Sequence, residues 1–207
     1  MKRNKLFIGS RASKLALIYA NKVKYEISKH YNKEIIIKEI NTTGDNKLDV
    51  RLSELGGKGL FSKNIESELL NKNIDLAVHA LKDLPSFDTE GLITNCFLKR
   101  NDSNEVMISN SNKKLSDLVP GSIVGTSSFR REFQLKRIRK DLNFKLIRGN
   151  VDTRIRKLKN GEYDAIILAK AGLSSLNLDK EITQEFSNND LIPSAGQGTI
   201  AVQCRKD

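Results

Sequence analysis

Short apolar runs alternate along the chain with longer stretches in which apolar residues recur every three or four positions. Runs of the first kind are typical of buried strands, and stretches of the second kind are typical of helices that pack on a sheet. In the first half of the chain, the pattern predicts strands over residues 5–8, 35–40 and 74–79 and helices over residues 13–30 and 61–69.

Two segments interrupt this pattern. Gly9 follows the first apolar run, and we expect it to form a turn. Residues 41–58 combine glycine, mixed charge and no clear period, which predicts a loop. Long loops without structure of their own are usually functional in compact domains, so we expect this loop to move over a ligand.

The second half of the chain repeats the alternation. It predicts strands over residues 122–125, 144–147, 164–169 and 199–203 and helices over residues 129–142 and 151–159, the first marked by Phe129, Phe133, Ile138 and Leu142. Alternating strands and helices indicate an α/β fold with mostly parallel sheets.

Polar segments divide the chain into two units. Residues 100–104 and 192–198 are expected to be inter-domain crossings. The first domain then comprises residues 1–100 and 198–207, because the last strand returns to it, and the second domain comprises residues 104–193. Two such units joined by two crossings make a two-lobed, hinged clamshell.

Composition narrows the class of protein. The 207 residues are 38% hydrophobic and 29% charged, as in soluble globular proteins. No apolar run approaches the length of a membrane span, and the first strand starts too early for a signal peptide, so we expect a cytoplasmic protein. Cys96 and Cys204 lack metal-ligand spacing and are expected to be buried thiols, and we expect no metal site.

Positive charge is concentrated in one segment. The chain carries a net charge of +11, and residues 130–160 hold twelve Lys or Arg against three Asp or Glu. Charge alone would also suit nucleic acid, but no recognition motif or aromatic platform accompanies it, so we expect no specific nucleic-acid partner.

Four predicted junctions between a strand or loop and a helix carry anion-binding residues. They are Ser10–Ser13, Thr126–Arg131, Arg148–Arg154 and Gly56–Gly59. Taken singly, each Ser or Thr can be an ordinary N-cap and each Arg a surface ion pair. Taken together, they indicate convergence on a ligand with several carboxylates or phosphates. The last segment lacks the spacing of a phosphate-binding loop and is interpreted as a lid that carries Lys58.

Asp83 is a lone carboxylate at the end of a predicted strand, beside Lys82. It can cap the turn before Pro85 or pair with Lys82, or it can face positive charge that develops on a ligand. His79 lies in the preceding apolar run, and a buried structural role is favoured over that of a catalytic base.

In combination, these segments resemble the porphobilinogen deaminase (hydroxymethylbilane synthase) family. The residues that carry the resemblance follow one another in the family's order and span nearly the whole chain: Ile8–Leu17, Thr43–Asp45, Gly56–Phe61, Asp75–Pro85, Val124–Arg131, Arg148–Arg154, Gly161–Leu168 and Pro193–Gly198. Tyr19, Ala80 and Ser175 depart from the family's pattern.

The resemblance implies a periplasmic-binding-protein-like clamshell, which agrees with the two-unit interpretation. It implies a transferase of tetrapyrrole and heme biosynthesis that joins porphobilinogen units head to tail, with release of ammonia, onto a dipyrromethane primer. Each unit brings an acetate and a propionate, which would account for the arginines. A non-catalytic clamshell that binds a polycarboxylate or linear tetrapyrrole is the alternative.

The resemblance also implies roles for individual residues. Asp83 would hold pyrrole N–H groups and stabilise cationic intermediates, and Lys58 would lie on the mobile loop. Residues near the substrate and the growing chain would be Arg11, Ser13, Arg148, Asn150, Arg154 and Gln197. Residues that bind the primer's carboxylates would be Lys82, Thr126, Ser127, Ser128, Arg130 and Arg131.

In the family, a third, smaller domain carries the primer on a loop cysteine through a thioether. Neither Cys96 nor Cys204 stands at the place of that cysteine, so we expect these 207 residues to lack covalent primer attachment. The expected partners are porphobilinogen, the dipyrromethane primer and a separate third-domain chain, and the chain itself is expected to be a monomer.

Overall fold

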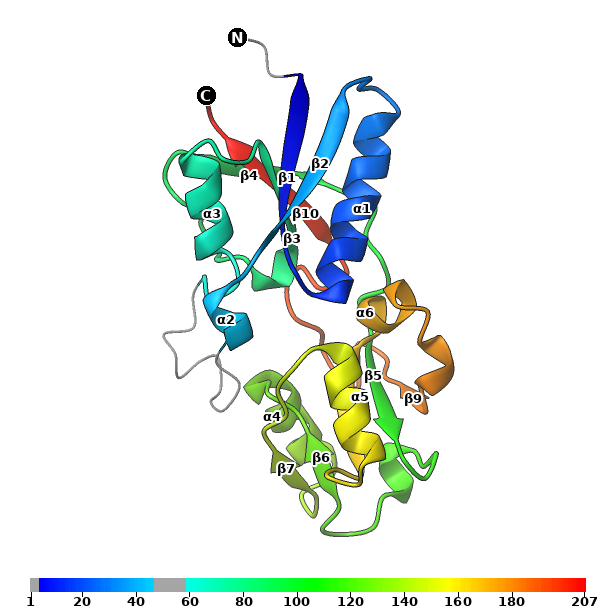
Figure 1. Cartoon of the computed structure of the whole chain (residues 1–207). Helices are drawn as coiled ribbons and strands as arrows, with labels where there is room; N and C mark the ends of the chain where they lie inside the picture. Colours follow the sequence, from blue (N-terminus) through cyan, green and yellow to red (C-terminus); the bar gives the residue numbers. More distant parts are fainter. Residues whose placement is uncertain (1–3, 47–58) are drawn as a thin grey trace. The chain divides into compact units, whose positions relative to one another are not determined.

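The computed structural model describes residues 4–46 and 59–207, which form two compact units (Figure 1). Unit 1 comprises residues 4–46, 59–100 and 199–207, and unit 2 comprises Asn101–Gly198. Lys58 and most of the predicted loop over residues 41–58 lie outside the described residues.

Unit 1 is built on a five-stranded sheet with the order β2-β1-β3-β10-β4. The strands β1, β2 and β3 are parallel, whereas β10 runs antiparallel to both β3 and β4. The last strand of the chain therefore returns to this sheet, as expected. The elements are β1 (Lys5–Arg11), α1 (Lys14–Ser28), β2 (Glu34–Ile40), α2 (Thr43–Asn46), α3 (Lys63–Leu70), β3 (Leu76–Ala80), a 3-10 turn (Leu81–Asp83), β4 (Leu92–Phe97) and β10 (Ile200–Arg205).

Helices α1 and α3 pack on the two faces of this sheet (Figure 1). On the α1 face, Ile8 and Val78 pack against Ala20 and Val23. On the α3 face, Ala77 packs with Ile65 and Leu69 of the helix. Burial on both faces explains why the parallel strands are apolar runs without strict alternation.

The predicted turn at Gly9 is wrong, because Gly9 lies inside β1 and pairs with Lys38 and Ala77. A Cβ atom at this position would come within 2.3 Å of Ile74 Cδ1 and 3.0 Å of Ile40 Cδ1. Glycine is needed here because neighbouring side chains fill the space above the strand, and not because the chain turns.

The predicted loop is also wrong at its start, where Thr43–Asn46 forms the short helix α2. A single turn is too short to show a period in the sequence. The backbone N–H of Gly44 donates to the carbonyl of Leu60 at 2.9 Å, which ties this turn to the chain that enters α3.

Unit 2 has a second five-stranded sheet with the order β7-β6-β8-β5-β9. The strands β6, β7 and β8 are parallel, and β5 runs antiparallel to β8 and β9. Within each sheet one strand opposes the other four, which agrees with the expected mostly parallel sheets. The elements are β5 (Glu105–Ser109), a 3-10 turn (Leu115–Asp117), β6 (Ile123–Gly125), α4 (Phe129–Ile138), β7 (Asn143–Lys145), α5 (Val151–Lys159), β8 (Ala165–Ala169), α6 (Lys170–Ser175), a second 3-10 turn (Asp179–Glu181) and β9 (Gln184–Glu185).

Helix α4 begins at the predicted residue but ends at Ile138, four residues before the predicted end, and its buried face is not the predicted one. Phe129, Phe133 and Ile138 are exposed, whereas Arg131 and Leu135 are buried. The three exposed apolar residues therefore do not mark the inner face. This face holds Leu135 and an arginine that has hydrogen-bond partners of its own.

The prediction of buried cysteines is wrong for Cys96, which is exposed, and Cys204 is half-buried. Cys96 lies in the second half of β4, which is exposed, and β4 is an edge strand of the sheet. Among residues 4–46 and 59–207, no helix is long and apolar enough to cross a membrane. The same residues contain no cluster of His, Cys, Asp and Glu that could hold a metal ion.

Candidate functional site

Arg11 and Asp83 meet at one edge of the unit 1 sheet. Arg11 is the last residue of β1, and Asp83 ends the 3-10 turn that directly follows β3. Because β1 and β3 are adjacent and parallel, their carboxyl ends lie together, which is where open α/β sheets bind ligands. Arg11 Nη1 lies 4.0 Å from Asp83 Oδ2, and the two side chains are 20% and 33% exposed.

Ser13 is the N-cap of α1, with its Oγ accepting from the N–H of Ala16 at 3.3 Å. The ordinary capping role is therefore confirmed for this serine. A hydroxyl that accepts this bond keeps its own proton, which can still be donated to an anion. Lys82 is exposed next to Asp83.

His79 lies in β3 as a buried side chain, as the sequence favoured. Burial lowers the pKa of His79 to about 4, and the nearby charge of Arg11 acts in the same direction, against the opposing effect of Gln203. The imidazole is therefore neutral at neutral pH. Buried Gln203 in turn donates to Glu66 of α3 at 3.1 Å.

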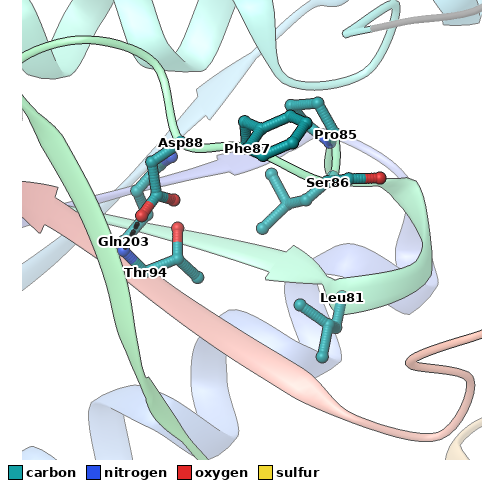
Figure 2. A pocket seen from close by; sticks show the side chains of 8 residues that line it. Leu81, Pro85, Ser86, Phe87, Asp88, Thr94 and Gln203 are labelled. Carbon is teal, nitrogen blue, oxygen red and sulfur yellow. Dashed lines mark hydrogen bonds between the residues drawn. The ribbon is translucent and has the colours of Figure 1, made fainter.

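A pocket in unit 1 lies beside the 3-10 turn Leu81–Asp83 (Figure 2). Its wall combines apolar and polar side chains: Leu81, Leu84, Pro85, Ser86, Phe87, Asp88, Thr94 and Gln203. Asp88 accepts from the backbone N–H of Thr94 at 3.3 Å, so this carboxylate already holds the start of β4. Asp83 is not among the lining residues.

In unit 2, the loop between β6 and α4 is fixed by its own hydroxyls. Thr126 Oγ1 accepts from the N–H of Ser128 at 3.1 Å, and Ser127 Oγ donates to the carbonyl of Ile147. Ser128 is the N-cap of α4 and accepts from the N–H of Arg131 at 3.4 Å. These contacts hold the start of α4 beside the segment that follows β7.

Arg130 and Arg131 both bind Glu105, the first residue of β5, which is fully buried. Arg131 Nη2 lies 2.7 Å from Glu105 Oε2, and Arg131 Nη1 donates to the carbonyl of Ile167 at 2.9 Å. The Arg131 side chain is only 8% exposed, whereas that of Arg130 is 29% exposed. Burial would raise the pKa of Glu105, but the charges and hydrogen bonds of Arg131 and Arg130 outweigh it and hold this pKa below its usual value.

The segment between β7 and α5, together with the first turn of α5, carries three more of the predicted residues. Arg148 is buried, Asn150 occupies the N-cap position of α5, and Arg154 Nε donates to the carbonyl of Gly149 at 2.8 Å. Gly149 has a φ of +108°, a conformation that favours glycine. Since β6 and β7 are adjacent and parallel, this segment and the loop before α4 follow the same edge of the unit 2 sheet.

Gln197 is buried at the second crossing. Its Nε2 donates to the carbonyl of Ser103 at 2.7 Å, and the next residue, Gly198, accepts from the backbone and side chain of Asn101. The amide therefore joins the two crossing segments. Its predicted role in substrate binding stays a prediction.

Sequence reasoning missed Glu105 and the contact between Phe61 and Arg11. Arg11 Cζ lies 4.0 Å from the centre of the Phe61 ring. A signal for Glu105 was present, since an acid directly before the apolar run Val106–Ile108 needs a buried partner. The Phe61 contact had no such signal, because it joins residues 50 positions apart.

Two solved structures show the same fold. The BenM effector-binding domain with benzoate has a TM-score of 0.57 and 13% identity, covering 98% of this chain and 84% of that one. The sulfate-bound regulatory domain of an OxyR2 mutant from Vibrio vulnificus has a TM-score of 0.58 and 13% identity, covering 100% and 91%. At this identity the likeness shows the fold alone, which is the expected two-lobed, periplasmic-binding-protein-like α/β fold.

Sequence comparisons are more specific. The family model described as "Porphobilinogen deaminase, dipyromethane cofactor binding domain" matches residues 6–207. Porphobilinogen deaminase from Bacillus pumilus (strain SAFR-032) is 50% identical over 204 residues, which are 97% of this chain and 65% of the relative. The enzyme from Geobacillus kaustophilus (strain HTA426) is 48% identical over 206 residues, 98% and 66% of the two chains.

The chain therefore belongs to the porphobilinogen deaminase family and carries its dipyrromethane-binding domain. It spans slightly less than two thirds of the length of the curated relatives it matches.

Proposed function

We propose that the chain forms the catalytic core of a hydroxymethylbilane synthase, a transferase that joins porphobilinogen units head to tail and releases ammonia to give the linear tetrapyrrole hydroxymethylbilane. The observation that carries the proposal is the carboxylate of Asp83 beside the guanidinium of Arg11, in a chain that the family model matches over residues 6–207.

The ligand's chemistry fits this pair. A porphobilinogen unit presents an acetate and a propionate, which need cations, and a pyrrole N–H, which needs an acceptor. Arg11 supplies a planar guanidinium suited to a carboxylate, and Asp83 supplies the acceptor. A carboxylate that is only partly exposed also acts more strongly on a ligand charge than one in bulk water.

The reaction develops positive charge next to the pyrrole nitrogen. When the C–N bond of the aminomethyl group breaks, the nitrogen leaves as ammonia and the methylene carbon stays on the pyrrole, which becomes an electron-poor azafulvene. The free α-carbon of the growing chain then forms the new C–C bond, and its proton is lost as the ring regains aromaticity. Asp83, fixed by the turn after β3, stabilises the positive charge in both steps and needs no rearrangement to do so.

The donor set in unit 2 fits the dipyrromethane cofactor, because it consists of guanidinium and hydroxyl groups and the cofactor carries carboxylates. When bound, dipyrromethane supplies the free α-carbon from which the chain grows. Arg130, the more exposed of the arginine pair, binds carboxylate directly together with Ser128. Lys82 of unit 1, an exposed cation, is assigned to the cofactor as well. Thr126 and Ser127 of the loop before α4 and Arg131 in the first turn of α4 keep Arg130 in place through internal hydrogen bonds.

The residues assigned to substrate and the growing chain are Arg11, Ser13, Arg148, Asn150, Arg154 and Gln197. Their shared property is hydrogen-bond donation, by guanidinium, hydroxyl or amide groups. Lys58 adds a further cation to this assignment. The chain acts as a monomer in the cytoplasm.

The test is turnover of porphobilinogen by the purified protein supplied with synthetic dipyrromethane. Ammonia release and formation of linear tetrapyrrole, read as uroporphyrin after cyclisation and oxidation, are measured together. Asp83→Asn keeps the side chain's shape and removes its charge, and should lower the rate by roughly 100-fold or more. The matched control is Glu90→Gln, an exposed acid in the loop before β4. Absence of product, or equal rates for Asp83→Asn and the control, would contradict the proposal.

A further inference from the structure

Phe61 of unit 1 contacts both Arg11 and Gly44. The guanidinium carbon of Arg11 stands 4.0 Å from the ring centre, a close cation–π contact. The Cδ1–Cε1–Cζ edge of the ring also occupies the space that a side chain at Gly44 would fill. The ring therefore joins α2 to the end of β1.

The contact with Gly44 leaves no room for a side chain. A Cβ atom at this position would come within 2.4 Å of Phe61 Cε1 and 2.7 Å of Cδ1. Unlike Gly149, Gly44 does not have a positive φ, so its backbone conformation is open to other residues. What excludes a side chain at this position is the ring itself, and a side chain could be accommodated only if the ring moved.

The ring is held from the backbone as well. The N–H of Gly44 donates to the carbonyl of Leu60, the residue before Phe61, at 2.9 Å. Ser62 N and Lys63 N donate to the carbonyl of Gly59 at 3.1 Å and 2.9 Å, which fixes the turn that presents the ring. A displaced ring would therefore have to change its rotamer, and would leave Arg11.

The stacked guanidinium of Arg11 does not form a short hydrogen bond with Asp83. The 4.0 Å between Arg11 Nη1 and Asp83 Oδ2 is longer than the 2.7–2.9 Å of a charge-assisted hydrogen bond. Arginine and carboxylate otherwise prefer a bidentate pair, in which both carboxylate oxygens are occupied. At the observed separation, Arg11 does not form a bidentate pair with Asp83.

We propose that Phe61, seated on Gly44, is a positioning residue that holds the Arg11 guanidinium away from a bidentate ion pair with Asp83. The stack keeps Arg11 oriented for a ligand carboxylate and Asp83 available for a ligand N–H. Gly44 is then required because any side chain at this position would displace the ring. The value of this arrangement for porphobilinogen rests on the proposed function, whereas the stack itself does not.

The experiment is a double-mutant cycle of Gly44→Ala and Phe61→Leu, read by NMR of protein labelled at arginine. Protons above an aromatic face are shifted upfield, so the Arg11 side-chain signals report the stack directly. Each single variant should move these signals downfield. Gly44→Ala should have little further effect in the Phe61→Leu background, because the ring it displaces is gone. Dispersed backbone amide spectra establish that each variant is folded, and Phe97→Leu, an exposed phenylalanine of β4, is the control.

The second measurement is the affinity of each variant for porphobilinogen, determined by calorimetry. Affinity should fall roughly tenfold in Phe61→Leu and Gly44→Ala and not in Phe97→Leu. Arg11 signals that stay in place in Gly44→Ala, or shifts that add in the double variant, would overturn the inference. A wild-type protein that shows the stack but binds no porphobilinogen would instead overturn the proposed function, so the two failures are distinct.

Discussion

Arg130 and Arg131 are neighbours in the chain, yet their surroundings differ. Both donate to the buried carboxylate of Glu105 and to a backbone carbonyl, but Arg131 is only 8% exposed, while Arg130 keeps 29% of its side chain in solvent. A sequence motif treats the two as equivalent. The difference in exposure leaves Arg130 more open to a ligand than Arg131.

His79 illustrates a second effect of burial. Its pKa of about 4 lies below the ordinary value of 6.5, because the imidazole is buried and lies near the charge of Arg11. In the unfolded chain this histidine gains a proton as the pH falls below about 6.5, whereas in the folded chain it stays neutral until about 4. The stability it contributes is therefore complete above 6.5 and is lost between 6.5 and 4.

This effect predicts a change in pH dependence for His79→Gln, which cannot titrate. Between pH 7 and pH 4, the wild-type free energy of unfolding should fall by ~3 kcal/mol more than that of the variant, from the shift at 1.36 kcal/mol per unit. Urea unfolding at several pH values measures the difference. Parallel pH profiles would show that His79 is not the group responsible.

At the scale of elements, Glu105 links β5 to α4. Helix α4 turns a charged residue toward the sheet, and this is stable only because Glu105 and the Ile167 carbonyl receive Arg131. A buried ion pair adds little net stability compared with apolar packing, but removal of one partner leaves an uncompensated charge in the core.

Glu105→Ala should therefore lower the free energy of unfolding by about 3–5 kcal/mol. Glu105→Gln, which keeps one acceptor and loses the charge, should cost less. The comparison variant is Glu181→Ala, which breaks an exposed pair with Lys159 and should cost less than about 1 kcal/mol. Chemical unfolding of the three variants decides the matter, and equal losses for Glu105→Ala and Glu181→Ala would refute the buried role.

Elements with a clear period were predictable from the sequence, and elements defined by tertiary pairing were not. Helix α5 has the predicted bounds, because Ile155 and Leu158 mark its buried face and Asn160 ends it. Strand β4 was missed because its burial changes along its length and shows no alternation. Strand β5 was missed because it is buried throughout and begins with an acid.

The candidate site divides in the same way. Residues at the ends of parallel strands, such as Arg11 and Asp83, could be expected to meet, because parallel pairing brings strand ends together. Contacts made between helices and loops could not be inferred. Gly44 was part of a recognisable motif, but only the structure relates it to Phe61.

At the scale of the whole molecule, the net charge of +11 has a consequence for binding. Several ligand carboxylates that meet several arginines lose attraction as salt screens the charges. The dissociation constant for porphobilinogen should rise by roughly tenfold between about 0.05 M and about 0.5 M NaCl. Titration calorimetry at each salt concentration tests this, with sucrose as an uncharged control. Affinity that does not respond to salt would contradict recognition by charge.

Native mass spectrometry of the protein exposed to dipyrromethane tests the central claim most directly. The account predicts an added mass of one dipyrromethane on the wild-type protein, strongly reduced in Arg130→Ala and retained in Lys136→Ala, which removes an exposed cation of the same helix. No added mass on the wild type, or equal retention by the two variants, would contradict the assignment of this domain's arginines to the cofactor.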